Sequence, residues 1–440
     1  MTVVQLPAKG LGRGPGTVRS GIVAALDIGS TKFSCLIAEA LPPRHRGDGE
    51  SRPALRILGV GHQAARGVRA GAVIDVDEAE RAIRMAVDAA ERMAQHTISE
   101  VYVNVSGGRP QSRLYTAAVP IQTGQVTLRD MDAALNAALT QVDPGKRSVL
   151  HLSLAQYHLD DVKGVKAPQG LYATSLGLDL GVVTVEPAHL HNLALAIERC
   201  HLTTAGFVMA PYAAAKAVLA DDEMALGVTV IDMGGATTSF AVFNDGNLVH
   251  ADIIPIGGQH ITNDIARGLA TTIAHAERMK TLWGSATPSQ IDEREMIAVP
   301  LLGERGVDTV QKVPKSMLTG IIRPRIEEVF EMVRNKIDAC GIAHLAGRRV
   351  VLTGGASQLT GVREVAAHWL DRQVRLGQPL PWPGLPEQAQ NSGFSVAAGL
   401  LRYAVQPDVH YALPKHKARQ IENAQQSYVR RMGRWIAESF

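Results

Sequence analysis

Two short segments, 205 residues apart, combine a carboxylate, glycines and hydroxyls in the same order: DIGSTK at 27–32 and DMGGATT at 232–238. Glycine lets backbone N–H groups approach an anion, and nearby hydroxyls can donate to phosphate oxygens. An aspartate beside such a turn can hold Mg²⁺ through its water shell. This chemistry suits a phosphate and metal site, although either turn alone could equally be an ordinary turn at a strand end.

The elements around these turns also repeat. VAALDIGSTKFSCLIA at 23–38 matches VTVIDMGGATTSFAVF at 228–243. Apolar runs this short, bounded by glycine, favour strands over helices. We therefore expect a strand, a tight turn and a second strand at each place. An internal repeat of this kind implies two related halves that face each other.

A third glycine turn follows in VVLTGGASQLTGV at 350–362. It predicts a strand, the pair Gly354-Gly355 and then a helix start, which leaves room for a nucleoside. The chain has no Walker GxxxxGK[ST] motif and no GxGxxG motif in a βαβ unit. The order of the three turns resembles the two phosphate motifs and the adenosine motif of the actin, Hsp70 and sugar-kinase ATPase superfamily. That resemblance implies a cleft that binds ATP and Mg²⁺.

Composition limits the class of protein. The 440 residues are 46% hydrophobic and 20% charged, which is ordinary for a globular protein and argues against wholesale disorder or a fibre. The sequence has no uncharged apolar run of about 18 residues, so no transmembrane helix is expected. The first 20 residues do not resemble a secretory signal. The three cysteines lie far apart, which favours a reduced, cytoplasmic protein.

The charge is unevenly distributed. The net charge is +3, but residues 21–405 hold 36 basic against 39 acidic residues, so both ends are basic and the body is mildly acidic. A body that binds nucleic acid is not expected. We do expect a basic end segment that meets an anionic surface.

Within the superfamily, several segments closely resemble the FtsA family of bacterial cell-division proteins. They are ISEVYVNVSGG, HLSLAQYHLDDVKGVKAPQGL, VIDMGGATTSFAVFNDG, VVLTGGASQLTGV and VAAGLLRY. The resemblance implies an α/β, actin/Hsp70-like two-lobed fold with duplicated βαβ cores. In this family, domain 1B is replaced by a 1C module on the opposite side.

The resemblance also implies domain limits. We expect a disordered basic tail over 1–20, domain 1A over 21–99 and 179–212 with a closing helix over 393–405, domain 1C over 100–178, domain 2A over 213–258 and 331–392, domain 2B over 259–330, a linker over 406–422 and an amphipathic membrane-targeting helix over 423–440.

The family's nucleotide contacts carry over to matching positions. The first phosphate loop would be Asp27, Gly29, Ser30, Thr31 and Lys32, and the second Asp232, Gly234, Gly235, Ala236 and Thr237, with Asp27 and Asp232 holding Mg²⁺ through water. Gly257 and Gly258 would begin the helix that carries the ribose and adenine contacts Glu277 and Lys280, and Gly354, Gly355 and Ala356 would cover the adenosine. Glu277 and Lys280 could instead be a solvated pair on a helix.

One position departs from the hydrolytic relatives. They carry a Glu or Gln where this chain has Ala210. A missing general base costs the chemical step about 10²–10⁴-fold. We therefore expect ATP binding with at most weak hydrolysis, and no confident catalytic residue. Asp232 could serve as a fallback base.

The last 18 residues, NAQQSYVRRMGRWIAESF, are amphipathic when placed on a helix. A basic, Trp-containing amphipathic helix is typical of a membrane-surface anchor. A terminal helix docked on the body is the alternative. The apolar stripe and its basic flanks are Tyr428, Met432, Trp435, Ile436 and Phe440 with Arg430, Arg431 and Arg434.

The resemblance implies the partners and the location. Family members bind the tail of the tubulin-like FtsZ through domain 2B, polymerise, and contact later division proteins through domain 1C. The basic residues that could meet the FtsZ tail are Arg294, Lys312, Lys315 and Arg323, each of which could also be ordinary surface charge. Anionic lipids and the cytoplasmic side of the inner membrane at the septum complete this expectation.

Two other interpretations fit parts of the sequence. One is a PilM-like type IV pilus assembly protein, which would typically lack the basic Trp-containing end. The other is a sugar or acetate kinase, or a polyphosphatase, of the same superfamily. Such an enzyme would need a carboxylate base in a second substrate pocket, and no residue in the sequence could be assigned to that role.

Overall fold

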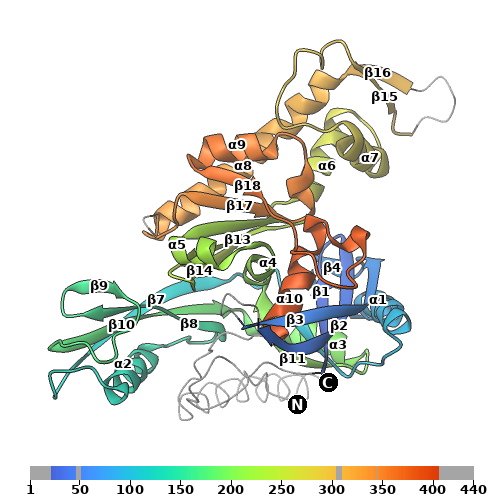
Figure 1. Cartoon of the computed structure of the whole chain (residues 1–440). Coiled ribbons are helices and arrows are strands. Elements are labelled where there is room, and N and C mark those ends of the chain that lie inside the picture. Colours follow the sequence, from blue (N-terminus) through green and yellow to red (C-terminus); the bar gives the residue numbers. More distant parts are fainter. Residues whose placement is uncertain (1–20, 46–50, 304–309, 344, 406–440) are drawn as a thin grey trace, which may run out of the picture.

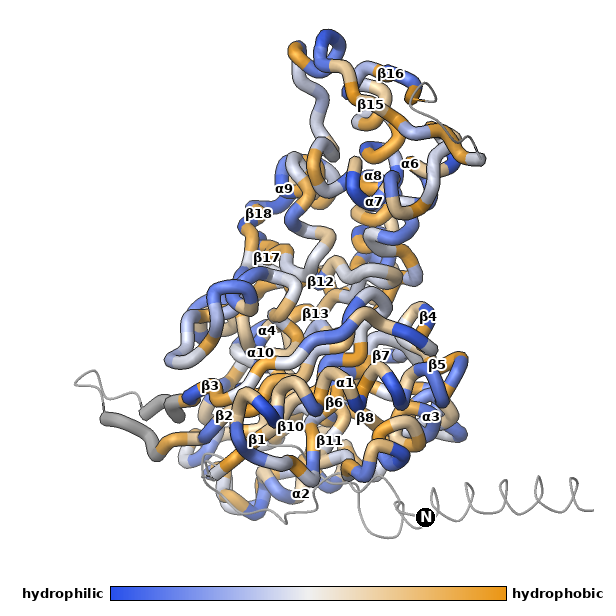
Figure 2. Tube along the Cα trace, turned by 90° about the vertical axis from the view of Figure 1, so that its right-hand side faces the viewer, coloured by the Kyte–Doolittle hydropathy of each residue, from blue (hydrophilic) through white to orange (hydrophobic). Residues whose placement is uncertain are grey.

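The computed structural model describes residues 21–45, 51–303, 310–343 and 345–405. The chain forms two lobes, each built around a five-stranded sheet, with a smaller sheet beside them (Figure 1). Figure 2 shows the lobe of β12 and β17 above the lobe of β1 and β6. This confirms the expected two-lobed α/β fold.

The first lobe has the strand order β11-β6-β1-β2-β3. Its central strand β1 is buried from Val23 onward, as expected for a strand covered on both faces. Helix α1 packs against β2 and β3, whereas α10 packs against β1, β2 and β6. The elements are β1 (Gly21–Ile28), β2 (Lys32–His45), β3 (Ser51–Ala64), α1 (Val76–Ala94), β6 (Glu100–Val105), α3 (Pro187–Glu198), β11 (Thr203–Met209), α4 (Ala210–Val218) and α10 (Ser395–Val405).

The second lobe has the order β14-β13-β12-β17-β18. In each lobe the first strand of the repeat pairs antiparallel with the next strand and parallel with a later one, so the predicted repeat is confirmed. The elements are α5 (Asp221–Leu226), β12 (Val228–Met233), β13 (Thr238–Asn244), β14 (Asn247–Ile254), α6 (Gly258–Gly268), α7 (Ile273–Trp283), β15 (Met296–Pro300), β16 (Val310–Pro314), α8 (Lys315–Ala339), β17 (Arg349–Thr353), η1 (Gly355–Gln358), α9 (Val362–Leu370), β18 (Gln373–Leu376) and η3 (Ser392–Phe394).

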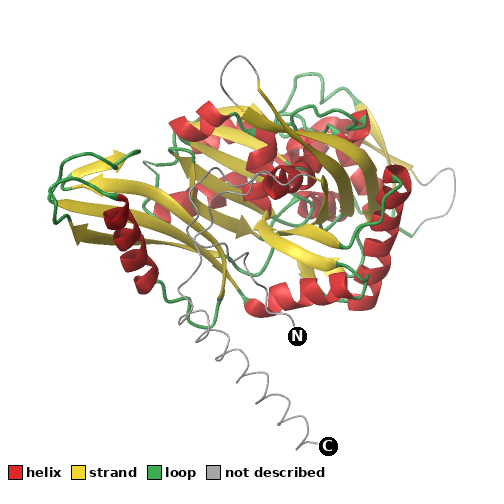
Figure 3. Ribbon diagram, turned by 60° about the horizontal axis from the view of Figure 1, so that its bottom comes forward, coloured by secondary structure: helices red, strands yellow, loops and turns green. Residues whose placement is uncertain are grey.

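An inserted module has its own sheet, with the order β7-β10-β8-β9, and its own apolar core. Figure 3 shows this sheet extending away from the body, with one helix along it. Helix α2 packs on β7 and β10. The elements are β7 (Gln111–Pro120), α2 (Leu128–Gln141), β8 (Ser148–Leu159), β9 (Val162–Val165) and β10 (Ser175–Val185).

The expected limits of this module, 100 and 178, are wrong. Strand β6 pairs in parallel with β1, where Ala25 lies beside Tyr102, so it belongs to the first lobe. Strand β10 pairs with β7 and β8 over nearly its whole length, so 178 falls inside it. Three further expected domain limits also fall inside elements: the limit after residue 212 lies in α4, the one after 330 in α8 and the one after 392 in η3. A continuous hydrogen-bonded element is a poor place for a domain boundary.

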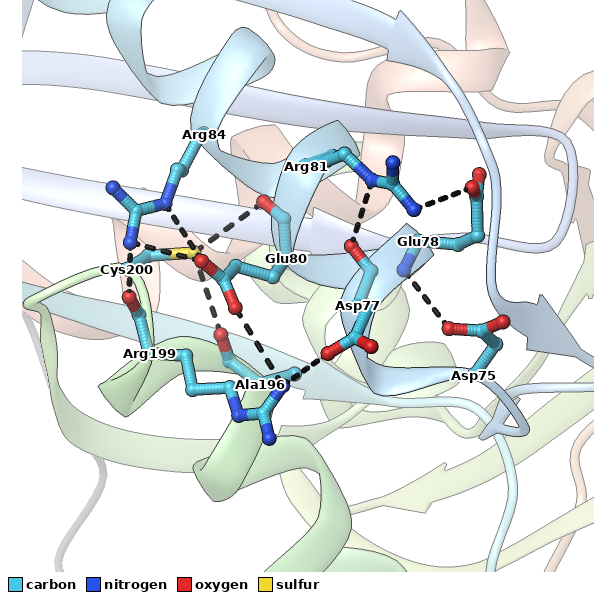
Figure 4. Close-up of polar contacts among 9 residues, drawn as sticks. All are labelled: Asp75, Asp77, Glu78, Glu80, Arg81, Arg84, Ala196, Arg199 and Cys200. Atoms are coloured by element: carbon cyan, nitrogen blue, oxygen red, sulfur yellow. Dashed lines mark hydrogen bonds and ion pairs between the residues drawn. The ribbon is translucent and has the colours of Figure 1, made fainter.

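Helices α1 and α3 are joined at the surface of the first lobe by a set of paired charges (Figure 4). The Arg199 guanidinium contacts Asp77 and lies 3.7 Å from Glu80, and Arg84 lies 2.9 Å from the same Glu80 carboxylate. Exposed ion pairs of this kind contribute only about 0–1 kcal/mol each. They fix the relative position of two helices while the apolar core supplies the stability.

None of the described helices is both long enough and apolar enough to span a bilayer.

Candidate functional site

A cavity of about 410 Å³ lies between the two lobes. This volume is in the range of about 300–1,000 Å³ that is typical of ligand pockets. Fifteen of the sixteen predicted nucleotide residues line it: Asp27, Gly29, Ser30, Thr31, Lys32, Asp232, Gly234, Gly235, Thr237, Gly258, Glu277, Lys280, Gly354, Gly355 and Ala356. Ala236, the sixteenth, is buried at 5% exposure and is not a lining residue.

The two repeated turns are closed by the same hydrogen bond. The Gly29 N–H donates to the Lys32 carbonyl at 3.1 Å, and the Gly234 N–H donates to the Thr237 carbonyl at 2.9 Å. A Cβ would lie 2.7 Å from the Lys32 oxygen at the first glycine and 3.0 Å from the Thr237 oxygen at the second. The glycines are therefore required by the tightness of the turns.

The turns approach each other across the cavity. A Cβ on Gly235 would lie only 2.3 Å from Cγ2 of Thr31. The Gln259 side chain reaches across from α6 and donates to the Ser30 carbonyl at 3.4 Å. Helix α6 itself is held against the second turn, since the Gly258 N–H donates to the Gly234 carbonyl at 2.9 Å. The two lobes therefore meet at the predicted phosphate loops.

The third turn completes the wall. Gly354 has a φ of 84°, and a Cβ there would lie 2.4 Å from Oδ1 of Asp232. Gly355, which follows it, is exposed and lines the cavity, yet nothing lies within 4 Å of the place its Cβ would take. Two glycines in sequence thus do different things: the first permits close packing against Asp232, and the second leaves open space in the cavity.

Two carboxylates and an amine are buried in this wall. Burial raises the pKa of Asp27; Lys32 opposes the rise and Asp232 adds to it. Burial raises the pKa of Asp232 to about 6, against a hydrogen bond from Ser239 that lowers it. Burial also lowers the pKa of Lys32, whose Nζ lies 3.2 Å from the centre of the Phe394 ring. A bound divalent cation would stabilise the charged form of the two carboxylates, and a bound polyphosphate would stabilise the charged form of the amine.

Glu277 and Lys280 differ in how much of their hydrogen-bonding capacity remains for a ligand. The Lys280 ammonium donates to the Gly258 carbonyl at 3.1 Å, to Oγ1 of Thr262 at 2.8 Å and to Oε2 of Glu277 at 2.7 Å. These contacts use all three of its N–H groups. Among the described residues, Glu277 accepts hydrogen bonds from Lys280 and from Oγ1 of Thr262 through Oε2 alone, and its side chain is 52% exposed. In this arrangement Lys280 holds α7 against α6, and Glu277 is the better placed of the two to meet a ligand.

Several cavity residues were not predicted: Asn104, Ser106, Gln259, Gln358, Ser392 and Gly393. Asn104, at the end of β6, is 2% exposed, and its Oδ1 accepts a hydrogen bond from the Ile28 N–H at 2.7 Å. The only signal in the sequence is a polar residue inside the otherwise apolar strand VYVNV. Ala210, whose importance was predicted, does line the cavity, at the start of α4.

The residues predicted to bind FtsZ or the membrane differ in their surroundings. Lys315 lies 3.3 Å from Asp292 and 3.1 Å from Glu295, and Arg323 pairs with Glu327 at 2.7 Å. Arg294 and Lys312 are exposed. All of the predicted membrane residues, from Tyr428 to Phe440, lie outside the described residues.

Two family models match parts of this chain. A family model described as "Cell division protein FtsA" matches residues 229–399, and one described as "SHS2 domain inserted in FTSA" matches 107–184. The second range agrees with the inserted module as the structure divides it.

A curated relative, "Cell division protein FtsA" of Rhizobium meliloti, is 43% identical over 429 residues, which is 96% of each chain. Two solved structures share the fold. The PilM-PilN type IV pilus biogenesis complex has a TM-score of 0.60 at 16% identity, and the match covers 88% of this chain and 99% of the other. MreB 5 of Spiroplasma citri bound to AMPPNP has a TM-score of 0.50 at 14% identity, and the match covers 92% and 99%. The likeness to these two structures shows the fold alone, whereas the curated relative decides the family. The chain has an actin-like ATPase fold and belongs to the FtsA family of bacterial cell-division proteins.

Proposed function

We propose that this member of the FtsA family binds ATP with Mg²⁺ between its lobes, polymerises at the septum on the inner face of the cytoplasmic membrane, and anchors the FtsZ ring there. One observation carries the nucleotide part: three glycine turns from distant parts of the chain meet in a single cavity with two buried carboxylates. The chemistry of these groups fits a nucleotide polyphosphate and its metal. Asp27 and Asp232 would hold the hydrated Mg²⁺, and the N–H groups of the glycine turns would face the phosphates.

Gly355 offers a sharp test of the cavity. Because nothing lies within 4 Å of the place that a Cβ would take at Gly355, we expect the side chain of Gly355→Leu to extend into the cavity. Gly320→Leu on α8 is a matched control, since it too meets nothing within 4 Å and does not line the cavity. By titration calorimetry we expect ATP to bind the first variant at least about tenfold more weakly, which is ~1.4 kcal/mol. The control should bind as the wild type does, and equal binding by all three proteins would refute the assignment.

The membrane part rests on the sequence of 423–440. Each basic residue near an anionic leaflet contributes about 1 kcal/mol, and each buried large apolar side chain about 1.5–3 kcal/mol. Part of this is lost in ordering a helix too short to be stable in water. One copy would therefore bind weakly, and a polymer with many copies firmly.

Co-sedimentation with anionic vesicles tests this part. We expect the full chain with ATP to sediment with the vesicles, and a chain ending at residue 422 or carrying Trp435→Glu to stay in solution. If all three proteins sediment alike, or none does, the anchor is not in this segment.

The FtsZ tail is the proposed partner of the small region that contains β15 and β16. Within it, Arg294 and Lys312 are the first residues to test, because they are exposed. Lys315 and Arg323 already form ion pairs with acidic side chains of this chain. They would have to break these pairs in order to bind an acidic peptide. Contacts with later division proteins are proposed for the inserted module.

A further inference from the structure

Each of the two repeated hairpins places a serine directly opposite its aspartate. Asp27 on β1 pairs with Ser34 on β2, and Asp232 on β12 pairs with Ser239 on β13. Directly opposite residues of an antiparallel pair point to the same face, with Cβ atoms about 4.5–5.5 Å apart. A hydroxyl at this position can reach the carboxylate by a rotamer change alone.

The two serines are in different states. Burial raises the pKa of Asp232, and hydrogen bonding by Ser239 lowers it. Ser34 is fully buried, at 0% exposure, and its Oγ has no hydrogen-bond partner among the described residues. A buried polar group without a partner costs about 1–3 kcal/mol. Alanine would avoid that cost in this strand, so packing alone does not account for a hydroxyl there.

We propose that Ser34 is a positioning residue for Asp27: its hydroxyl donates to the Asp27 carboxylate when Mg²⁺ and nucleotide enter the cavity, from the position that Ser239 holds opposite Asp232. The inference rests on the proposed function of the same cavity. It assigns a purpose to the buried Ser34 hydroxyl, which the nucleotide contacts carried over from the family do not include.

The physical reason lies in the crowding of Asp27. This carboxylate is 7% exposed and lies among Lys32, Asp232 and the first glycine turn. To hold a hydrated cation it must present one oxygen in a fixed direction. A hydroxyl that donates to its other oxygen would fix that direction. Hydrogen bonds of this supporting kind typically change metal affinity by about 10–100-fold.

Thr238 provides a matched control. It is also fully buried, at 0% exposure, and its hydroxyl also lacks a partner among the described residues, but it lies opposite Met233 and not opposite an aspartate. Thr238→Val and Ser34→Ala therefore each remove a buried hydroxyl that has no partner among the described residues. Only the second removes it from beside a proposed Mg²⁺ carboxylate.

The experiment measures ATP affinity of the full chain as a function of Mg²⁺ concentration, and again in EDTA. For Ser34→Ala we expect the Mg²⁺ midpoint to rise about tenfold, while the affinity in EDTA stays within about twofold. The melting temperature without nucleotide should not fall, since an unsatisfied group is lost. Thr238→Val should match the wild type in the Mg²⁺ midpoint and in the affinity in EDTA, and its melting temperature should not fall either.

Two results would overturn the inference in distinguishable ways. If the wild type binds ATP and Ser34→Ala shows an unchanged Mg²⁺ midpoint, Ser34 does not position Asp27 and the proposed function stands. If the wild type binds no ATP at any Mg²⁺ concentration, the proposed function fails and the inference fails with it.

Discussion

Ser112 of the inserted module and Ala251 of the second lobe exchange two hydrogen bonds. Oγ of Ser112 accepts from the Ala251 N–H at 3.0 Å and donates to the Ala251 carbonyl at 2.8 Å. Close by, Oγ of Ser153 donates to the Leu248 carbonyl at 2.7 Å. Both partners lie on β14, the edge strand of the second sheet. The module thus follows β6 of the first lobe in sequence and covers the open edge of the second.

Ser112→Ala should weaken this junction, because it leaves the Ala251 N–H and carbonyl without a protein partner. We expect the free energy of unfolding to fall by about 1–3 kcal/mol, and hydrogen exchange to speed up in β14. Ser175→Ala, which removes only a 3.5 Å hydrogen bond within the module, is the control. Equal effects of the two substitutions would show that the junction contributes no stability.

Ala210 should limit hydrolysis. It is 1% exposed and lines the cavity, and the resemblance to the ATPase superfamily implies a carboxylate or amide at this position in hydrolytic relatives. Single-turnover assays should show slow ATP hydrolysis by the wild type and a rate at least about tenfold higher for Ala210→Glu, a part of the about 10²–10⁴ that a positioned base supplies. Ala210→Leu, similar in size and without the base, should stay slow. A fast wild type would contradict the role given to this position.

The hairpin turns could be predicted because their signals are local. Gly29 and Gly234 each lie within three residues of the carbonyl that their N–H contacts, so the pattern is visible in the sequence. Asn104 could not be predicted as a cavity residue, because β6 reaches β1 by a parallel pairing of Ala25 with Tyr102, 77 residues apart. Parallel pairing across a long connection leaves no local pattern.

The roles of Glu277 and Lys280 show the same limit. Their three-residue spacing on a helix predicts that the two side chains meet. The sequence does not show that Lys280 also reaches Gly258 and Thr262, since those contacts depend on how α7 packs against α6.

Glu277 and Lys280 should therefore respond differently to substitution. Glu277→Ala should reduce the preference for ATP over 2′-deoxy-ATP, because the exposed carboxylate is the one proposed to meet the ribose. Lys280→Met should lower the melting temperature, because it removes three hydrogen bonds, and should leave that preference unchanged. Competition binding with the two nucleotides measures the first effect, and thermal unfolding the second. A Lys280→Met protein of normal stability that cannot discriminate would reverse the assignment.

Asp179 should make the inserted module sensitive to acid. Burial raises its pKa, but hydrogen bonds from Thr116, Gln156 and His158 outweigh burial and hold the pKa below its ordinary value of 3.8. Because the folded pKa lies below the unfolded one, the stabilisation is present above about pH 4 and is lost as the pH falls through the folded pKa.

Asp179→Asn should therefore be less stable than the wild type at pH 7, by about 1–3 kcal/mol, and the difference should shrink below pH 4. Denaturant unfolding at pH 7, 5 and 3 gives the comparison, with the exposed Asp161→Asn as control. A difference that stays constant with pH would show that the Asp179 charge does not contribute.

The recruitment of fluorescent FtsZ to anionic vesicles tests the central claim most directly. With Mg²⁺ and ATP, the full chain should bring FtsZ to the vesicle surface, whereas a chain ending at residue 422 should not. Gly355→Leu should recruit much less than the wild type at equal protein concentration. If FtsZ reaches the vesicles equally with every variant, or never with the full chain, the cavity and the final segment do not together form an ATP-dependent membrane anchor.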